Sequence, residues 1–412
     1  MTITEKNILR ELAMEYAEAA SNPIHETKRK LWKKLNSLNP KRPMVMIDQV
    51  CWGELESSCS ELKLQCTDKI LQKFERKLRR DLYQWKHFPV DFVLEPYLEI
   101  NYVIHNSGFG IKVEDEILIS DIHNDVVSHK FHNQMKDDKD LEKIKEPVIT
   151  YDSKETEKIF SIANDIFDGI IELRLDGQTP YLSIWDFISQ IMPVEDLLYS
   201  LIDRPDFMHE LARRISNGYM KMLDQLENQG LLPRPQKLIH CTGAYSDELP
   251  AEGYDPQKPR CKDIWMFGLA QVFSTVSPEM FEEYEVKYSS PICERFGLVY
   301  YGCCDPLDSK MEQVRKIPNV RKVSMSPWTN PERGAEEIHG DFVFSSKPNP
   351  AHVAGENFNE ELVRNELNKI KNACKKNNCP LEFILKDIST IKYDPCRLEK
   401  WAKIAMEIAE NA

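Results

Sequence analysis

The chain has 412 residues, of which 42% are hydrophobic and 29% charged, and its formal net charge is −13. Such an acidic chain is a poor candidate for binding nucleic acid or an anionic membrane surface through bulk electrostatics. No apolar run approaches the ~18 residues that cross a bilayer, and the eleven cysteines lack the compact, regular spacing of a disulfide framework. We therefore expect a cytoplasmic protein with reduced thiols and with no membrane or nucleic-acid partner.

The first 40 residues predict two amphipathic helices. Residues 7–20 and 25–38 both place apolar side chains at three- and four-residue spacing. The sequence Asn-Pro-Lys-Arg-Pro at 39–43 then interrupts the helical pattern. No linker or internal repeat divides the rest of the chain, so we interpret residues 1–40 as an N-terminal helical extension and residues 41–412 as one domain.

From residue 41 onward, short apolar runs alternate with helical segments. This alternation predicts parallel strands joined by right-handed crossovers. Eight strand-like runs together predict an α/β fold of the TIM (β/α)8 barrel type. The predicted strands are residues 44–48, 91–97, 169–175, 237–241, 298–304, 321–326, 342–348 and 381–387.

Functional residues of a TIM barrel lie at the carboxyl ends of its strands. The carboxylates predicted there are Asp48, Glu95 and Asp387. Burial near the mouth of a barrel would raise their pKa values toward neutrality, as general acid or base catalysis requires. The alternative is that each carboxylate forms a structural ion pair at the rim with Lys347 or Lys386.

The segment 277–327 resembles the uroporphyrinogen decarboxylase superfamily. It begins with Ser-Pro-Glu at a helix start, and its strand ends in Tyr-Tyr-Gly-Cys-Cys at 300–304. The resemblance extends more weakly to residues 42–55 and 383–390, and it covers about residues 40–410. It implies a TIM barrel and one of several activities, which include decarboxylation, zinc-dependent methyl transfer with cobalamin, and ether demethylation.

The residues after the first predicted strand disfavour decarboxylation of a porphyrinogen. The decarboxylases of the family carry a Gln-Ala-Gly-Arg stretch there, and its arginines bind the carboxylates of the substrate. Residues 47–55 of this chain instead read Ile-Asp-Gln-Val-Cys-Trp-Gly-Glu-Leu, with the acidic Glu54. An acidic pocket repels a polycarboxylate, so the resemblance points to the methyltransferase branch.

The zinc-dependent methyltransferases of the family bind their metal through His-x-Cys at one strand end and a cysteine on the last strand. The resemblance places Tyr301 at the histidine position, Cys303 at the first cysteine and Ser389 near the last one. His240 ends the preceding predicted strand, and neighbouring strands lie about 5 Å apart. His240 and Cys303 therefore make up a candidate for a non-standard zinc site.

Side-chain alternation along a strand limits this site. It predicts that only one of Cys303 and Cys304, and only one of His240 and Cys241, points inward. The alternative to a metal site is that one cysteine packs against a helix and the other lines a pocket, since free cysteines are commonly buried.

Tyr301 replaces the family histidine at a strand end expected to face the pocket. It is a candidate proton donor to a departing alkoxide or phenoxide, and the alternative is packing with a hydrogen-bonded hydroxyl. Further candidates for substrate contact are the side chains Glu54, Tyr97, Trp328, Lys347 and Asp387.

The resemblance implies a methyltransferase that moves a methyl group from a small O- or N-methylated substrate to the cobalt of a partner corrinoid protein. The incomplete zinc triad favours this demethylase half-reaction, in which no thiol needs activation. The chain has no Asp-x-His-x-x-Gly cobalamin loop, so the partner would carry the corrinoid. The alternatives are a decarboxylase or lyase of a small carboxylate and a non-catalytic barrel that binds a corrinoid protein. The oligomeric state stays open between monomer and homodimer.

Overall fold

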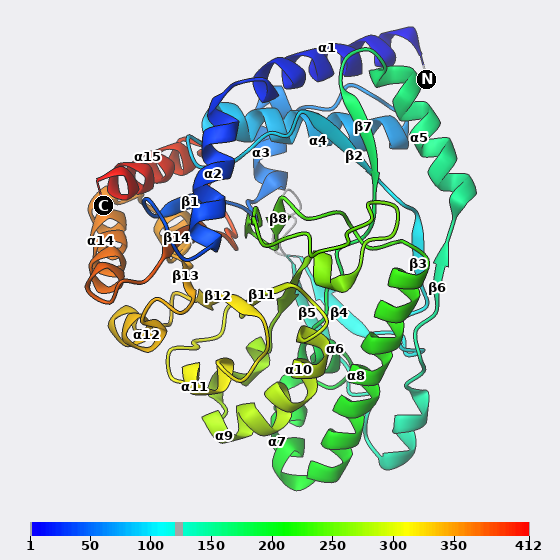
Figure 1. Cartoon of the computed structure of the whole chain (residues 1–412), viewed down its shortest axis with the longest axis vertical. Helices are drawn as coiled ribbons and strands as arrows, with labels where there is room; N and C mark the ends of the chain where they lie inside the picture. The colour runs from blue at the N-terminus through cyan, green and yellow to red at the C-terminus, as the bar shows by residue number, and fades with distance from the viewer. Residues whose placement is uncertain (1, 120–126, 412) are drawn as a thin grey trace.

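A parallel sheet of six strands lies at the centre of a mixed α/β fold (Figure 1), as the computed structural model shows for residues 2–119 and 127–411. Residues along these strands are buried on both faces, as expected where helices cover a parallel sheet. In sheet order, the strands are β1 (Met44–Ile47), β14 (Leu381–Leu385), β13 (Val343–Ser346), β12 (Val320–Met325), β11 (Leu298–Tyr301) and β10 (Trp265–Gly268). The first and last strands of the alternating region are therefore direct neighbours.

A separate parallel pair consists of β2 (Tyr97–Asn101) and β7 (Glu172–Asp176). The chain next to this pair reaches both edges of the six-stranded sheet, because Asp91 N donates to Val45 O at 2.9 Å and Tyr181 forms an isolated parallel bridge with Phe267. The six strands of the sheet and the two strands of this pair together make eight parallel strands, which is the number in a TIM barrel. The described residues show no continuous ladder between the two sheets, so the closed barrel stays a prediction.

Helices cover the sheet and begin at capped residues. Asp68, Ser183 and Asn359, for example, each accept a backbone N–H from the first turn of the following helix. The larger helices are α3 (Trp52–Ser58), α4 (Lys69–His87), α5 (Ser153–Phe167), α6 (Ile184–Ile191), α7 (Val194–Asp203), α8 (Pro205–Asn228), α10 (Lys287–Cys293), α12 (Pro331–Ile338), α14 (Glu360–Lys376) and α15 (Cys396–Glu410). The short helices are α9 (Pro278–Phe281), α11 (Met311–Val314) and α13 (Ala351–Ala354). Among the described residues, no helix has both the length and the apolar character that a bilayer crossing needs.

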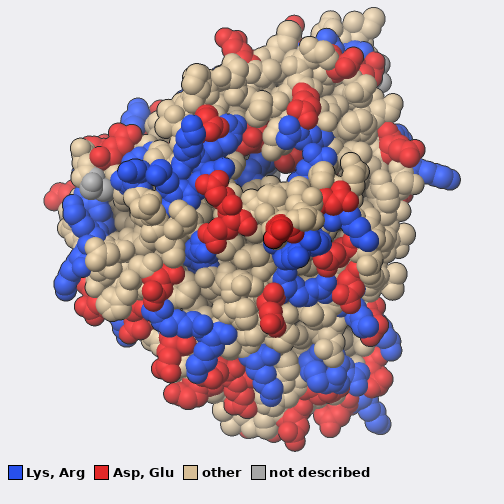
Figure 2. All heavy atoms as spheres, viewed as in Figure 1, with Lys and Arg blue, Asp and Glu red and all other residues tan. Residues whose placement is uncertain are grey.

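The two N-terminal helices, α1 (Ile3–Ala20) and α2 (Ile24–Asn36), form as predicted. The first packs against α4 and α5. The second buries Trp32, whose indole N–H donates to Asp91 O at 3.0 Å and whose ring lies where a Cβ on Gly243 would sit. The opposite face of α2 carries the basic side chains that gather over this helix in Figure 2.

The predicted strand at 237–241 is wrong. The chain instead forms an antiparallel hairpin of β8 (Leu238–Ile239) and β9 (Thr242–Gly243) near the centre of the molecule in Figure 1. His240 lies at the turn with a left-handed φ of 52°. The side chains of this hairpin pack into the same apolar cluster as Trp32 and the inner residues of the sheet.

One strand boundary and one additional strand also differ from the sequence prediction. The strand predicted at 91–97 begins only at Tyr97, directly after Pro96, whose nitrogen has no hydrogen to donate to a ladder. The sheet also contains β10, which lies in a segment that the sequence pattern left irregular. The remaining short strands pair antiparallel, as β3 (Ile104–Asn106) with β6 (Ile149–Tyr151) and β4 (Asp115–Leu118) with β5 (Ser128–Phe131).

Candidate functional site

A buried lysine after β14 connects three polar groups, which come from the loops after β11 and β14 and from the turn between β8 and β9. The ammonium of Lys386 lies 2.9 Å from Cys303 Sγ, 2.9 Å from His240 Nε2 and 3.1 Å from Asp387 Oδ2. Its side chain is only 2% exposed. The sequence prediction that His240 and Cys303 lie side by side therefore agrees with their separation of 3.8 Å between Nε2 and Sγ. We name Cys303, Cys304, His240, Lys386 and Asp387 the thiol cluster.

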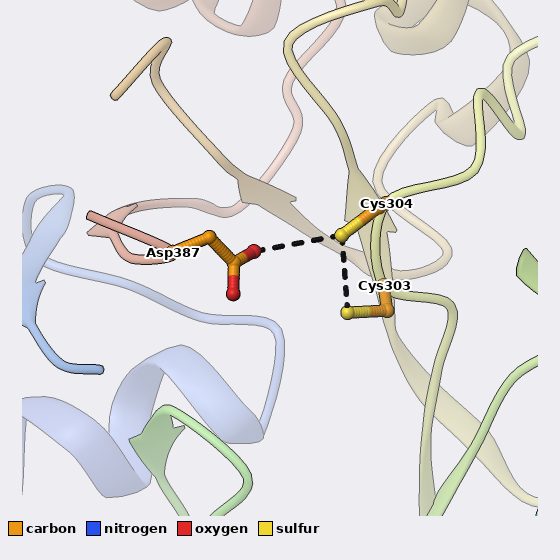
Figure 3. A group of neighbouring side chains, drawn as sticks. All are labelled: Cys303, Cys304 and Asp387. Atoms are coloured by element: carbon orange, nitrogen blue, oxygen red, sulfur yellow. Dashed lines mark hydrogen bonds between the residues drawn. The ribbon is translucent and has the colours of Figure 1, made fainter. Parts of the chain in front are cut away.

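The second cysteine completes the thiol cluster toward solvent. Cys304 Sγ lies 3.5 Å from Cys303 Sγ and 3.5 Å from Asp387 Oδ2, as Figure 3 shows. Cys303 is buried, whereas Cys304 and Asp387 are exposed. One side of the cluster is therefore accessible from outside, while Lys386 and Cys303 lie beneath it.

A left-handed glycine determines which side chains enter the thiol cluster. Gly302 has a φ of 89°, and a Cβ at this position would lie 2.5 Å from Leu307 Cδ1. This conformation ends the alternation of the strand. Tyr300 and Cys303 consequently pack in one apolar cluster and Tyr301 in another.

Of the two adjacent cysteines, Cys303 is buried and Cys304 exposed, as the prediction of one inward side chain expects, but the premise of that prediction does not hold. It assumed a regular strand through residue 304, but β11 ends at Tyr301. The same premise fails for His240 and Cys241, because these two residues form the turn between β8 and β9. Cys241 is fully buried with its Sγ 3.9 Å from the hydroxyl of Tyr300, and the His240 ring is stacked 4.0 Å from the Phe267 ring, centroid to centroid.

The environment of Cys303 favours its thiolate. The hydrogen bond with Cys304, the contact with His240 and the charge of Lys386 lower the pKa of Cys303 despite its burial. The same hydrogen bond raises the pKa of Cys304, which keeps its proton. Burial lowers the pKa of Lys386, but the neighbouring thiols and Asp387 outweigh burial and raise it. The cluster therefore holds a thiolate–ammonium pair.

Two more carboxylates belong to this region. Burial raises the pKa of Asp48, and the charges of His240 and Lys386 act in the opposite direction. Asp186 was missed by the sequence prediction because it lies in the first turn of α6, not at a strand end. Its burial, with the nearby charge of Cys303, raises the pKa of Asp186 to about 6, where a carboxyl group can both donate and accept protons near neutral pH.

Hydrogen bonds fix one oxygen of Asp186. Its Oδ2 accepts from the Tyr181 hydroxyl at 3.1 Å and from Gln271 Nε2 at 3.0 Å. Its Oδ1 is buried and has no hydrogen-bond partner among the described residues. Tyr181 also lies beside the Phe267 ring on which His240 is stacked. Asp186 and Tyr181 thus adjoin the thiol cluster.

Tyr301 does not face the thiol cluster, contrary to the prediction. Its hydroxyl donates to Glu285 Oε1 at 2.9 Å, and its ring packs edge-on against Phe281. Both partners belong to the helical segment before α10, and Tyr301 is fully buried among them. The positive φ of Gly302 is the physical reason, since it separates Tyr301 from the direction that Cys303 takes. The alternative interpretation, packing with a hydrogen-bonded hydroxyl, describes what is found.

Glu95 and Tyr97 have partners other than the thiol cluster. Glu95 Oε1 accepts from the Tyr245 hydroxyl at 2.5 Å and from Arg29 Nε at 3.1 Å. The guanidinium of Arg174 lies 3.7 Å from the centroid of the Tyr97 ring. Glu95 therefore forms an ion pair with α2, as the alternative of a structural ion pair foresaw, although its partner is an arginine and not a lysine.

The other proposed substrate contacts are also dispersed. Glu54 accepts the backbone N–H of Ile391 at 3.0 Å and is buried. Trp328 is 77% exposed. Lys347 is buried at the end of β13, and its ammonium donates to Ser345 Oγ at 2.6 Å. Of the predicted site residues, the structure thus brings together His240, Cys303 and Asp387. Asp48 lies close enough for the charges of His240 and Lys386 to affect its pKa.

The ligand types of the thiol cluster suit zinc, but its lysine competes with a metal ion. Ligand atoms of Cys303, Cys304 and Asp387 all lie within 4.8 Å of one another, and His240 Nε2 is a fourth donor of the kind that zinc prefers. The ammonium of Lys386 contacts three of these four groups. Lysine and metal ion therefore exclude each other, and zinc would bind here only after Lys386 had moved out.

Comparison with known proteins shows the fold. No family model and no curated protein matches the chain. Among solved structures, a methyltransferase from Methanosarcina mazei aligns with 92% of this chain and 97% of its own, with a TM-score of 0.51 and 11% sequence identity. The two chains therefore share their fold over nearly their whole lengths.

Proposed function

We propose that the protein is a corrinoid-dependent methyltransferase that takes the methyl group from a small O- or N-methylated substrate. A partner corrinoid protein would present its cofactor at the carboxyl ends of the strands. The fold shared with a methyltransferase supports methyl transfer. The observation that carries the proposal is the ammonium of Lys386, which follows β14 and is held within 3.1 Å of Cys303, His240 and Asp387.

The chemistry that this chain supplies is protonation of the leaving group. Demethylation leaves an alkoxide, phenoxide or amine behind, and a positioned acid accelerates such a step by about 10²–10⁴-fold. Lys386 is the proton donor in this proposal. The corrinoid, when bound, supplies a nucleophilic cobalt that accepts the methyl group. Lys386 takes over the role that the sequence prediction gave to Tyr301.

The neighbours of Lys386 keep this acid ready. The thiolate of Cys303 and the carboxylate of Asp387 hold the lysine in its charged form, although burial alone would favour the neutral amine. His240 Nε2 lies 2.9 Å from the ammonium and limits the positions that the lysine can take. Asp387 is exposed and gives the lysine a route to solvent, from which it can regain a proton after each transfer.

The decisive experiment mixes the protein with a reduced corrinoid protein and screens methoxy and methylamino compounds while the cobalt(I) absorption is followed. We expect a substrate-dependent loss of that absorption. Lys386→Met should slow it by about 100-fold or more. Lys369→Met is the control, because this lysine is 59% exposed on α14. Equal rates for both variants would refute the role of Lys386, and substrate consumption without any corrinoid protein would refute the function.

A second candidate function is a decarboxylase or lyase of a small carboxylate. Two buried cations favour it, since Lys347 and Lys386 follow the neighbouring strands β13 and β14 and are 4% and 3% exposed. Such a pair suits a carboxylate ligand. Turnover of a carboxylic acid without corrinoid protein would support this candidate. Tight binding of the corrinoid protein without any turnover would instead support a non-catalytic accessory.

A further inference from the structure

The two adjacent thiols of the thiol cluster are arranged for reaction with each other. Cys303 Sγ and Cys304 Sγ lie 3.5 Å apart, so the sulfurs need to approach each other by only about 1.5 Å to reach the disulfide length of about 2.05 Å. Cys304 is exposed, so an oxidant in solution reaches it first. Cys303 lies behind it with its sulfur beside the ammonium of Lys386, which stabilises the thiolate needed to attack an oxidised neighbour.

A bond between neighbouring cysteines is reversible under mild conditions. Adjacent Cα atoms lie about 3.8 Å apart, which is shorter than the roughly 4.4–6.8 Å that ordinary disulfides span. Strained, exposed disulfides have higher reduction potentials and are the labile ones. A bond at 303–304 would therefore form under oxidising conditions and open again when the thiol pool is reduced, unlike a bond that stabilises a fold.

We propose that Cys303 and Cys304 are a site of reversible oxidation that turns the thiol cluster off. As a statement about regulation, this inference rests on the proposed function. In the disulfide, Cys303 no longer carries the negative charge that faces Lys386, and Cys304 no longer contacts Asp387. The ammonium of Lys386 then loses the sulfur anion 2.9 Å away that helps to hold it, while Asp387 stays its partner, so the proton donor is no longer fixed in its position toward the leaving group.

The reaction is balanced with a small-molecule disulfide such as oxidised glutathione as the oxidant. Cys304 first passes its proton to the Cys303 thiolate 3.5 Å away and, as a thiolate, attacks one sulfur of glutathione disulfide. This forms a mixed disulfide and releases one glutathione thiolate, which takes the proton back from Cys303. The thiolate of Cys303 then attacks Cys304 Sγ, which forms the 303–304 bond and expels the second glutathione as a thiolate. The two cysteines lose two electrons, and the glutathione disulfide gains them.

The sequence provides a direct readout. Trypsin cleaves after Arg295 and Lys310, and the resulting peptide 296–310 contains Cys303 and Cys304 and no other cysteine. After incubation with oxidised glutathione and capping of free thiols, we expect this peptide to be two hydrogen masses lighter than the reduced, uncapped peptide. Cys304→Ser should abolish that species. Cys396→Ser is the matched control, because Cys396 is another exposed thiol and its loss should leave the 303–304 bond unaffected.

Glutathionylation of Cys396 in the wild-type protein shows that the oxidant has reached exposed thiols. If Cys396 is modified while peptide 296–310 keeps both thiols free, the inference is overturned. In the corrinoid assay, the oxidised protein should lose activity by about 100-fold and regain it with a thiol reductant. If the 303–304 disulfide forms but the protein transfers no methyl group, only the proposed function is refuted. If the protein transfers methyl groups but peptide 296–310 stays reduced, only the redox inference is refuted.

Discussion

Removal of the Lys386 charge should raise the pKa of Cys303. Unit charges 2.9 Å apart attract each other by roughly 6 kcal/mol at an effective dielectric constant of about 20. Water that reaches the exposed Cys304 and Asp387 weakens this attraction, and an opposite charge at such a distance typically shifts a pKa by about 1–3 units. For Lys386→Met we therefore expect a rise of about 2 units, which corresponds to roughly 2.7 kcal/mol of lost stabilisation of the thiolate.

The assay follows alkylation of peptide 296–310 by iodoacetamide as a function of pH. A Cys304→Ser background leaves Cys303 as the only thiol in that peptide, so the midpoint of the rate profile reports its ionisation. Lys369→Met in the same background is the control for the loss of one positive charge at the surface. A midpoint that moves no further for Lys386→Met than for the control would refute the argument, because Lys386 would then not be the charge that holds the thiolate.

Three further changes test other parts of the structure. Burial raises the pKa of Glu285 to about 8 from an ordinary 4.5, so between these pH values the folded state holds a proton that the unfolded state releases, and stability falls as pH rises. Glu285→Gln should remove about 1 kcal/mol per pH unit of that slope in denaturant titrations. An unchanged slope would contradict the assignment. Lys322 and Glu382 form a fully buried ion pair at 2.7 Å. Lys322→Met should therefore lower the unfolding free energy by about 3–5 kcal/mol, and the added change Glu382→Leu should restore most of that loss. Equal stability of the single and double variants would contradict the cost of leaving Glu382 unpaired. Lys386→Ala should bind about one zinc ion per chain by elemental analysis, because the remaining side chains have the composition of a zinc site. The added change Cys303→Ser should abolish zinc binding. Equal zinc binding by the wild-type protein would show that the ammonium does not compete with the metal.

Local sequence patterns were sufficient for most of the sheet and both N-terminal helices. The strands β11 to β14 are apolar runs followed by helical segments, and this pattern was recognised. The strand β10 was missed because Trp265–Gly268 lies in a segment that otherwise shows neither a helical nor a strand period, so its short apolar run does not stand out from a loop. Residues 237–241 were taken for a strand because an apolar run does not reveal that the chain folds back at His240.

The candidate site was predicted in part for similar reasons. His240 and Cys303 were expected to be close because they end neighbouring predicted strands. They do lie 3.8 Å apart, but His240 reaches Cys303 from a hairpin turn and not from a strand of the sheet. The central position of Lys386 depends on contacts between residues distant in sequence, so the pattern offered it only as a rim cation. Tyr301 was assigned inward by counting alternate residues, and a single positive φ at Gly302 was enough to invalidate that count.

Gly302 therefore determines the arrangement of the thiol cluster without being part of it. An alanine there would need both a strained backbone and a displaced Leu307. The cheapest relaxation is an extended backbone, which would turn residue 303 toward the helices and carry its sulfur out of reach of Lys386. A variant that retains every polar side chain of the site would then behave like one that lacks its thiolate, so a screen restricted to reactive residues would overlook the position on which their arrangement depends.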